Sequence, residues 1–72
     1  MTQEQIDLIA QLAEHHGAHM VQLTYRRTGD AQQAQDIVQE TFLTACCRAE
    51  VLAAHVNPAG WLYQVLTFLT RR

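Results

Sequence analysis

Three histidines near the start of the chain form the cluster that most resembles a metal site. His15 and His19 are four residues apart, a spacing typical of helical zinc ligands because it places both imidazoles on one face. In zinc proteases with this spacing a glutamate follows the first histidine, whereas His16 and Gly17 follow here. No carboxylate or further histidine stands at a supporting spacing. We therefore expect no metal and no cofactor, with His16 on the inner side of a helix and the other two near the surface.

Two adjacent cysteines are the second group with chemical potential. Cys46 and Cys47 have neither a zinc-ligand spacing nor a disulfide framework, and a disulfide between neighbours is strained. We expect buried or half-buried free thiols in a reducing compartment. The chain has no Ser/His/Asp arrangement and no glycine-rich phosphate loop, so we predict no catalytic residues. An enzyme is the least favoured class.

A row of polar residues favours binding over catalysis. Asp36, Gln39, Glu40 and Leu43 stand at positions i, i+3, i+4 and i+7, on a face distinct from the apolar stripe of the same segment. A helix face exposed only to solvent explains the two acids and the glutamine as well as a binding face does. Leu43 favours a protein-binding face, since interfaces combine an apolar centre with a polar rim.

A lone tryptophan follows the Asn57-Pro58 pair. Trp61 is either a plug in the core, the commoner fate of a tryptophan in a small domain, or a platform on which an unpaired base stacks. We expect Tyr63 and Gln64 on the outer side of the same turn. A surface of this kind suits single-stranded nucleic acid better than a duplex.

Helices must position these residues, because apolar residues recur at steps of three and four along the chain. We predict an all-α fold, a compact bundle of three main helices over about residues 2–27, 31–49 and 58–71, in a single domain over residues 1–72. Gly29 and Asp30 separate the first two helices, and Asn57 with Pro58 starts the third. Residues 51–56 are expected as frayed helix or loop.

Two features of these helices carry further expectations. Gly17 costs roughly 1 kcal/mol relative to alanine inside a helix, which indicates either close helix approach or a break of the first helix near this residue. The third helix is apolar around more of its circumference than one face requires. We therefore expect self-association, or a missing segment that covers Phe68.

Composition limits the function classes. The 72 residues are 49% hydrophobic and carry a net charge of -2, and all the basic residues are arginine. This balance argues against a generic polyphosphate binder, whose surface carries a basic patch. We find neither a signal peptide nor a membrane-spanning stretch, and expect a cytoplasmic protein without membrane contact.

Three sequence elements together indicate a family. They are Tyr25-Arg26-Arg27-Thr28-Gly29-Asp30, then Ala34-Gln35-Asp36-Ile37-Val38-Gln39-Glu40-Thr41-Phe42-Leu43-Thr44-Ala45, then Trp61-Leu62-Tyr63. Their order and spacing over about residues 23–69 resemble region 2 of the bacterial sigma-70 family, most closely its extracytoplasmic-function (ECF) group.

The resemblance implies a transcription initiation module with two binding surfaces. One docks on the clamp helices of the RNA polymerase β′ subunit, and the implied residues are Asp36, Gln39 and Glu40. We add Leu43 to this expected polymerase-binding set because it lies in the same row. The other engages the melted non-template strand of the promoter −10 element. The expected DNA-binding residues are Asn57, Gly60, Trp61, Gln64, Arg26 and Arg27. An anti-sigma factor is a further possible partner.

Departures from the family pattern keep a second hypothesis open. Family members commonly have arginine three positions after the tryptophan and an Arg-Asn pair six and seven after it, where this chain has Gln64, Thr67 and Phe68. The family's second domain, which reads the −35 element, is missing from the sequence. The alternative is a sigma-like interaction protein that binds polymerase or another subunit without reading DNA.

Overall fold

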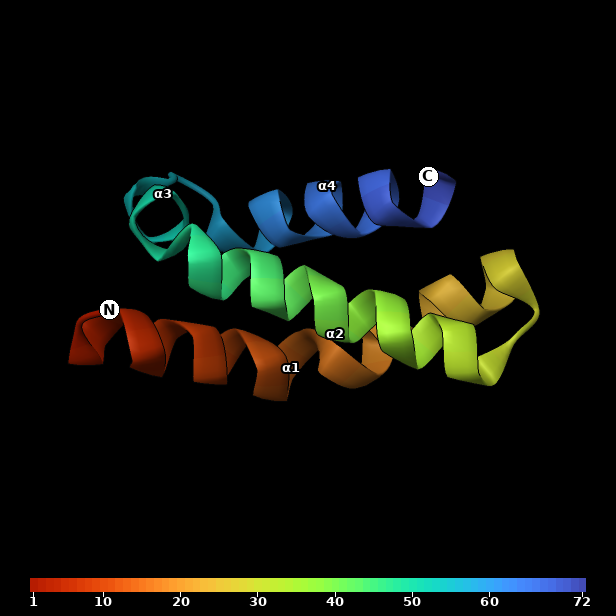
Figure 1. Ribbon diagram of the computed structural model, residues 1–72. Coiled ribbons are helices and arrows are strands. Elements are labelled where there is room, and N and C mark those ends of the chain that lie inside the picture. The colour runs from red at the N-terminus through yellow and green to blue at the C-terminus, as the bar shows by residue number, and fades with distance from the viewer.

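The computed structural model describes residues 1–72 and contains four helices and no strand. They are α1 (Gln3–Thr28), α2 (Ala31–Cys47), α3 (Ala49–Ala54) and α4 (Pro58–Arg71). In Figure 1, α2 runs beside α1, α4 lies along the other side of α2, and the short α3 is seen end-on before α4. The predicted all-α bundle of three main helices is confirmed.

The caps explain where the long helices begin and end. Thr2 and Gln5 form a capping box at the start of α1, and Gly29 ends that helix with a left-handed φ of 71°. The Asp30 side chain then accepts a hydrogen bond from the backbone N–H of Gln33 at 3.1 Å and starts α2. The turn between α1 and α2 is therefore as short as the sequence predicts.

The expected end of the second helix is wrong. α2 ends at Cys47, and residues 49–54 form a separate helix, α3, in place of a continuation and a frayed segment. Arg48 divides the two helices with φ −122° and ψ 38°, outside the helical range. Ala49 and Leu52 are buried, so this short helix contributes to the core.

Neither expectation for Gly17 is correct. α1 continues through it without a break, and a Cβ built at this position meets no atom within 4 Å, so no helix approaches closely. No contact at Gly17 itself offsets the cost of the glycine. The helix tolerates it because the buried Leu12 and Met20 anchor α1 on both sides.

The core lies between the three long helices and is closed at one end by α3. Its buried residues are Ile9, Leu12, Met20, Ile37, Val38, Ala45, Ala49, Leu52, Leu62, Leu66 and Leu69. Two buried threonines satisfy their hydroxyls within their own helices: Thr24 donates to the Met20 carbonyl at 2.8 Å, and Thr41 to the Ile37 carbonyl at 2.9 Å. None of the four helices has the length and apolar character needed to cross a bilayer.

Candidate functional site

The polar row predicted on α2 divides between two hollows. Gln39 and Leu43 line a groove between α1 and α2. Asp36 and Glu40 line a smaller hollow between α2 and the end of α4. The split arises because α2 lies between its two partner helices, so that one side of the row borders α1 and the other borders α4 (Figure 1).

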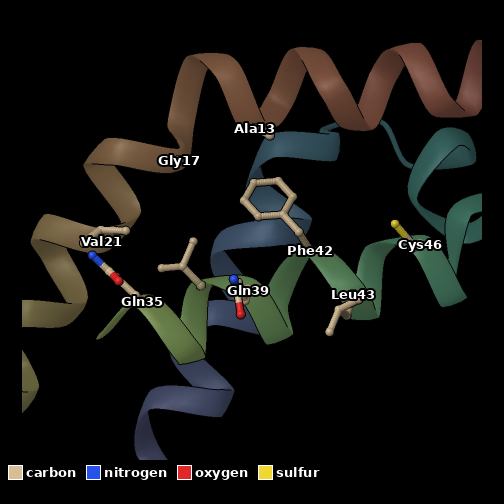
Figure 2. Close-up of a pocket in the computed structure, with 9 residues that line it drawn as sticks. Ala13, Gly17, Val21, Gln35, Gln39, Phe42, Leu43 and Cys46 are labelled. Carbon is tan, nitrogen blue, oxygen red and sulfur yellow. The ribbon is translucent and has the colours of Figure 1, made fainter. Parts of the chain in front are cut away.

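The groove between α1 and α2 is the largest hollow of the chain, with a volume of about 830 Å³. Its lining residues are Ala13, Gly17, Val21, Gln35, Val38, Gln39, Phe42, Leu43 and Cys46. Figure 2 shows the Phe42 ring directed toward α1, with Gln35, Gln39 and Leu43 along α2. No lining residue is charged, so the groove offers apolar surface and two amides to a partner.

Glu40 forms an ion pair with the end of the chain's last helix. Its Oε2 lies 2.6 Å from Nη2 of Arg72, which joins α2 to the end of α4. The two side chains are 41% and 58% exposed, so water screens this ion pair and a competing partner can open it at little cost. Asp36 is exposed and accepts one hydrogen bond from Gln32 Nε2 at 3.0 Å.

Asn57 and Gly60 have a structural role at the start of α4. Asn57 Oδ1 accepts a hydrogen bond from the Gly60 N–H at 3.0 Å, and Pro58 occupies the first turn. A Cβ at Gly60 would lie 2.6 Å from Asn57 Nδ2. A larger residue at position 60 would therefore displace the capping side chain. Val56, just before the cap, is 98% exposed.

Trp61 combines features of the two roles that the sequence left open, a plug in the core and a stacking platform. Its side chain is half-buried and packs against the core, so part of the indole stabilises the fold and part is accessible. Gln64, one turn further along α4, is exposed as expected.

The predicted DNA-binding residues do not form one cluster. Asn57, Gly60 and Trp61 lie at the start of α4, whereas Arg26 and Arg27 lie in the last turn of α1. Arg27 borders a hollow of about 110 Å³ whose α4 lining runs from Tyr63 to Thr70. The start of α4 is roughly 15 Å or more from that end of the helix, at 1.5 Å per residue.

The sequence predicted Tyr63 on the outer side of α4, and this prediction is wrong. Its hydroxyl oxygen is 3.1 Å from His16 Nδ1 and 3.0 Å from His19 Nδ1, both on α1. The two imidazoles meet the phenol ring edge-to-face, with centroids 5.5 and 6.0 Å away. Burial raises the pKa of Tyr63 above its usual value. The expectation failed because α4 contacts both α1 and α2, which widens its inward-facing arc.

The three histidines of α1 lie where the sequence predicts. His16 is half-buried while His15 and His19 are exposed, as predicted. No three His, Cys, Asp or Glu side chains are grouped so as to hold a metal ion.

Cys46 and Cys47 are free as expected but both are exposed, which corrects the prediction of burial. The inward positions of this segment belong to residues at steps of four, Thr41, Ala45 and Ala49, so the cysteines turn outward.

Comparisons with known proteins find similarity over most of the chain. Residues 12–72 match the family model described as Sigma-70 region 2. Over 59 residues the chain is 42% identical to the ECF RNA polymerase sigma factor SigL of Mycobacterium tuberculosis, covering 81% of the chain and 33% of SigL. Over 64 residues it is 31% identical to the ECF RNA polymerase sigma factor SigW of Bacillus subtilis, covering 89% of the chain and 34% of SigW. The chain thus spans about a third of the length of these relatives. No solved structure gives a significant match.

Proposed function

The chain belongs to the sigma-70 region 2 family, and from this premise we propose that it is a transcription initiation module that docks on RNA polymerase through α2. The resemblance to ECF sigma factors drawn from the sequence is confirmed. Sigma factors are initiation factors and not enzymes. The proposal therefore concerns binding surfaces, and it treats residues 1–72 as one binding domain.

The groove between α1 and α2 is the observation that carries the proposal. Leu43 is 64% exposed at its edge, which leaves a large apolar side chain in water where a partner can cover it. Gln35 and Gln39 provide amide donors and acceptors beside it. An amphipathic helix fits such a groove, with apolar anchors placed at its floor. We assign this groove to the clamp helices of the β′ subunit.

Electrostatics support a basic partner on the neighbouring side of α2. Asp36 forms no ion pair, and Glu40 is held only by the exposed ion pair with Arg72. A basic side chain from the partner can replace Arg72 at Glu40. Complementary charge of this kind accelerates association and fixes register more than it adds affinity.

Binding of the chain to a β′ clamp-helix fragment tests the proposal. The double variant Gln39→Ala with Leu43→Ala should weaken binding by tenfold or more, because it removes an amide and the exposed apolar anchor together. The matched control is Gln11→Ala with Val51→Ala, which changes an exposed glutamine and an exposed aliphatic residue outside the groove. Equal affinities for the double variant and the wild type, with unchanged circular dichroism, would remove α2 from the interface.

We further propose that the start of α4 engages the single-stranded −10 element within the polymerase complex. Support comes from Trp61, whose indole is partly accessible, and from Val56, which projects before the cap. The proposal implies a cytoplasmic site of action, where an anti-sigma factor is a candidate regulator. Single-stranded −10 DNA should quench Trp61 emission at low salt.

The alternative, a sigma-like protein that binds polymerase without reading DNA, also has a specific observation in its favour. The side-chain oxygen of Asn57 is occupied by the helix cap, which leaves its amide nitrogen as the free polar group for a base. Strong clamp binding with no change in Trp61 emission would favour this alternative.

A further inference from the structure

One arginine of the chain is already in contact with the polar row of α2. Arg72, which directly follows α4, places its Nη2 2.6 Å from Glu40 Oε2. The two residues line the hollow of about 230 Å³ between α2 and the end of α4, together with Asp36 and Leu69. Leu69 is buried in the core, so the last turn of α4 is anchored and Arg72 extends to Glu40 from a fixed base.

The contact between Arg72 and Glu40 is the one ion pair of the chain. The sequence has seven acidic residues and five arginines, so many other pairings are chemically possible. Arg71, the adjacent residue, carries the same charge at the end of α4 and is also exposed, yet no carboxylate lies within salt-bridge distance of it. The ion pair therefore involves one of the acids that the proposed function assigns to polymerase.

A second copy of the chain is the other candidate partner for this end of the molecule. The apolar surplus that the sequence predicts on α4 narrows to Phe68, which is 69% exposed, because Leu62, Leu66 and Leu69 are buried. A stable interface between two copies buries about 800 Å² on each partner around an apolar centre. One phenylalanine provides no such centre, so we treat the ion pair as a contact within a single chain.

Arg72 makes Glu40 a weaker target for any other cation. The guanidinium neutralises the carboxylate, so a basic side chain from a partner gains little there until it displaces Arg72. The two side chains are 58% and 41% exposed, and exposed ion pairs favour the paired state by a factor of only about 1.5 to 5. Arg72 therefore lowers the apparent affinity for such a partner by up to about fivefold without preventing binding.

We infer that Arg72 is an internal competitor for Glu40: in the free chain it occupies the carboxylate that a basic side chain of the β′ clamp helices takes in the complex. The inference rests on the proposed function, because it requires that Glu40 meets this partner. The competition adds specificity, since a partner gains from Glu40 only when its cation makes a better contact than Arg72 does. An arginine placed for two parallel hydrogen bonds meets this condition more readily than a lysine.

Fluorescence anisotropy with a labelled β′ clamp-helix fragment tests the inference, using the full chain at low salt. Arg72→Gln should bind the fragment about twofold to fivefold more tightly than the matched control Arg71→Gln. Both variants remove one positive charge from the end of α4, so the long-range attraction to a basic fragment rises equally in the two. Only Arg72→Gln frees Glu40. The difference between the variants should shrink as salt is raised, because ions screen an exposed pair.

The same comparison in the Glu40→Gln background isolates the ion pair. Without the carboxylate there is nothing for Arg72 to occupy, so Arg72→Gln and Arg71→Gln should bind the fragment equally. A difference that persists in this background would mean that Arg72 acts on another group, such as Asp36 in the same hollow, and would overturn the inference.

The outcomes separate the inference from the proposed function. If the wild type binds the fragment and Arg72→Gln binds it no better than Arg71→Gln, the internal competition is wrong and polymerase docking stands. If Arg72→Gln binds more weakly than Arg71→Gln, Arg72 itself contacts the partner, which also overturns the inference. If neither the wild type nor any variant binds the fragment, the docking proposal and the inference fall together.

Discussion

At the scale of single residues, the Tyr63 hydroxyl connects α4 to α1. It lies within hydrogen-bond distance of His16 Nδ1 and His19 Nδ1. When both imidazoles are neutral, the hydroxyl donates its proton to one ring and accepts the N–H of the other, since a phenol has one proton and two lone pairs. The hydroxyl therefore joins two consecutive turns of α1 to one position of α4.

Removing this hydroxyl should cost a modest amount of stability. We expect Tyr63→Phe to lower the free energy of unfolding by about 0.5–1 kcal/mol at neutral pH, because the histidines regain hydrogen bonds to water. Urea denaturation measures the difference. A loss of several kcal/mol would show that the variant's phenyl ring has moved and that Tyr63 does more than join the two histidines to α4.

The same variant should change the alkaline limb of the stability curve. Burial raises the pKa of Tyr63 in the folded state, which favours the neutral phenol. The stability that the neutral phenol contributes is complete below the unfolded pKa of about 10 and is lost as pH rises through the raised folded pKa. The wild type should therefore lose stability relative to Tyr63→Phe above about pH 10. Parallel curves for the two proteins would contradict this.

Residue types and spacing predicted some side-chain positions and missed others. The inner position of His16 follows from its place in the apolar stripe of α1, and it is confirmed. The contact of Tyr63 with two histidines depends on how α4 crosses α1, and separations of 47 and 44 residues give no local signal of it. The Glu40–Arg72 ion pair has the same origin, 32 residues apart.

At the scale of elements, the start of α4 depends on two residues that fit each other. Asn57→Ala should destabilise the protein by about 1 kcal/mol through loss of the cap. Gly60→Ala should cost a similar amount, because its Cβ would lie 2.6 Å from Asn57 Nδ2 and displace the capping side chain.

A double-mutant cycle checks this dependence. Once Asn57 is alanine, Gly60→Ala no longer displaces a cap, and the better helix propensity of alanine should make it neutral or stabilising by up to about 1 kcal/mol. Denaturant unfolding of the four proteins measures the coupling. Additive costs would mean that Gly60 has another role, such as contact with a partner.

Gly17 offers a second prediction for an element. Gly17→Ala should stabilise the chain by about 0.5–1 kcal/mol, because α1 is continuous there and an added Cβ meets no atom within 4 Å. Gly17→Leu should instead fill the groove and weaken clamp binding. Ala18→Leu, an exposed neighbour outside the groove lining, is its control. Equal binding by the two leucine variants would show that the partner does not enter the groove at Gly17.

The long helices were predictable because their ends carry recognisable caps and their interiors a clear period. Gly29, Asp30, Asn57 and Pro58 mark the ends as the sequence indicates. α3 was not predictable as a helix, since six residues with two buried positions contain too little of a helical period.

At the scale of the whole molecule, the two proposed surfaces belong to different elements. The groove lies between α1 and α2, and the proposed contact with the −10 strand lies at the start of α4. The arginines at the ends of α1 and α4 gather at one end of the molecule, while the acids of the row lie on α2. A net charge of -2 limits the DNA affinity of the chain alone, so the proposed −10 contact requires that polymerase hold the chain near the strand.

The sequence predicted the family, but it did not predict how the polar row of α2 is divided in space. The α2 row looks continuous along the helix, yet packing against α1 and α4 assigns its members to separate hollows. Only the arrangement of the three long helices determines this division.

Chemical-shift mapping by NMR, with the isotope-labelled chain and an unlabelled β′ clamp-helix fragment, tests polymerase docking most directly. The account predicts the largest shifts for the backbone amides of Gln35, Gln39 and Leu43 on α2 and of Gly17 on α1, with Gln64 and Phe68 on α4 unmoved. Shifts confined to α4, or no shifts at saturating fragment, would contradict docking through the groove.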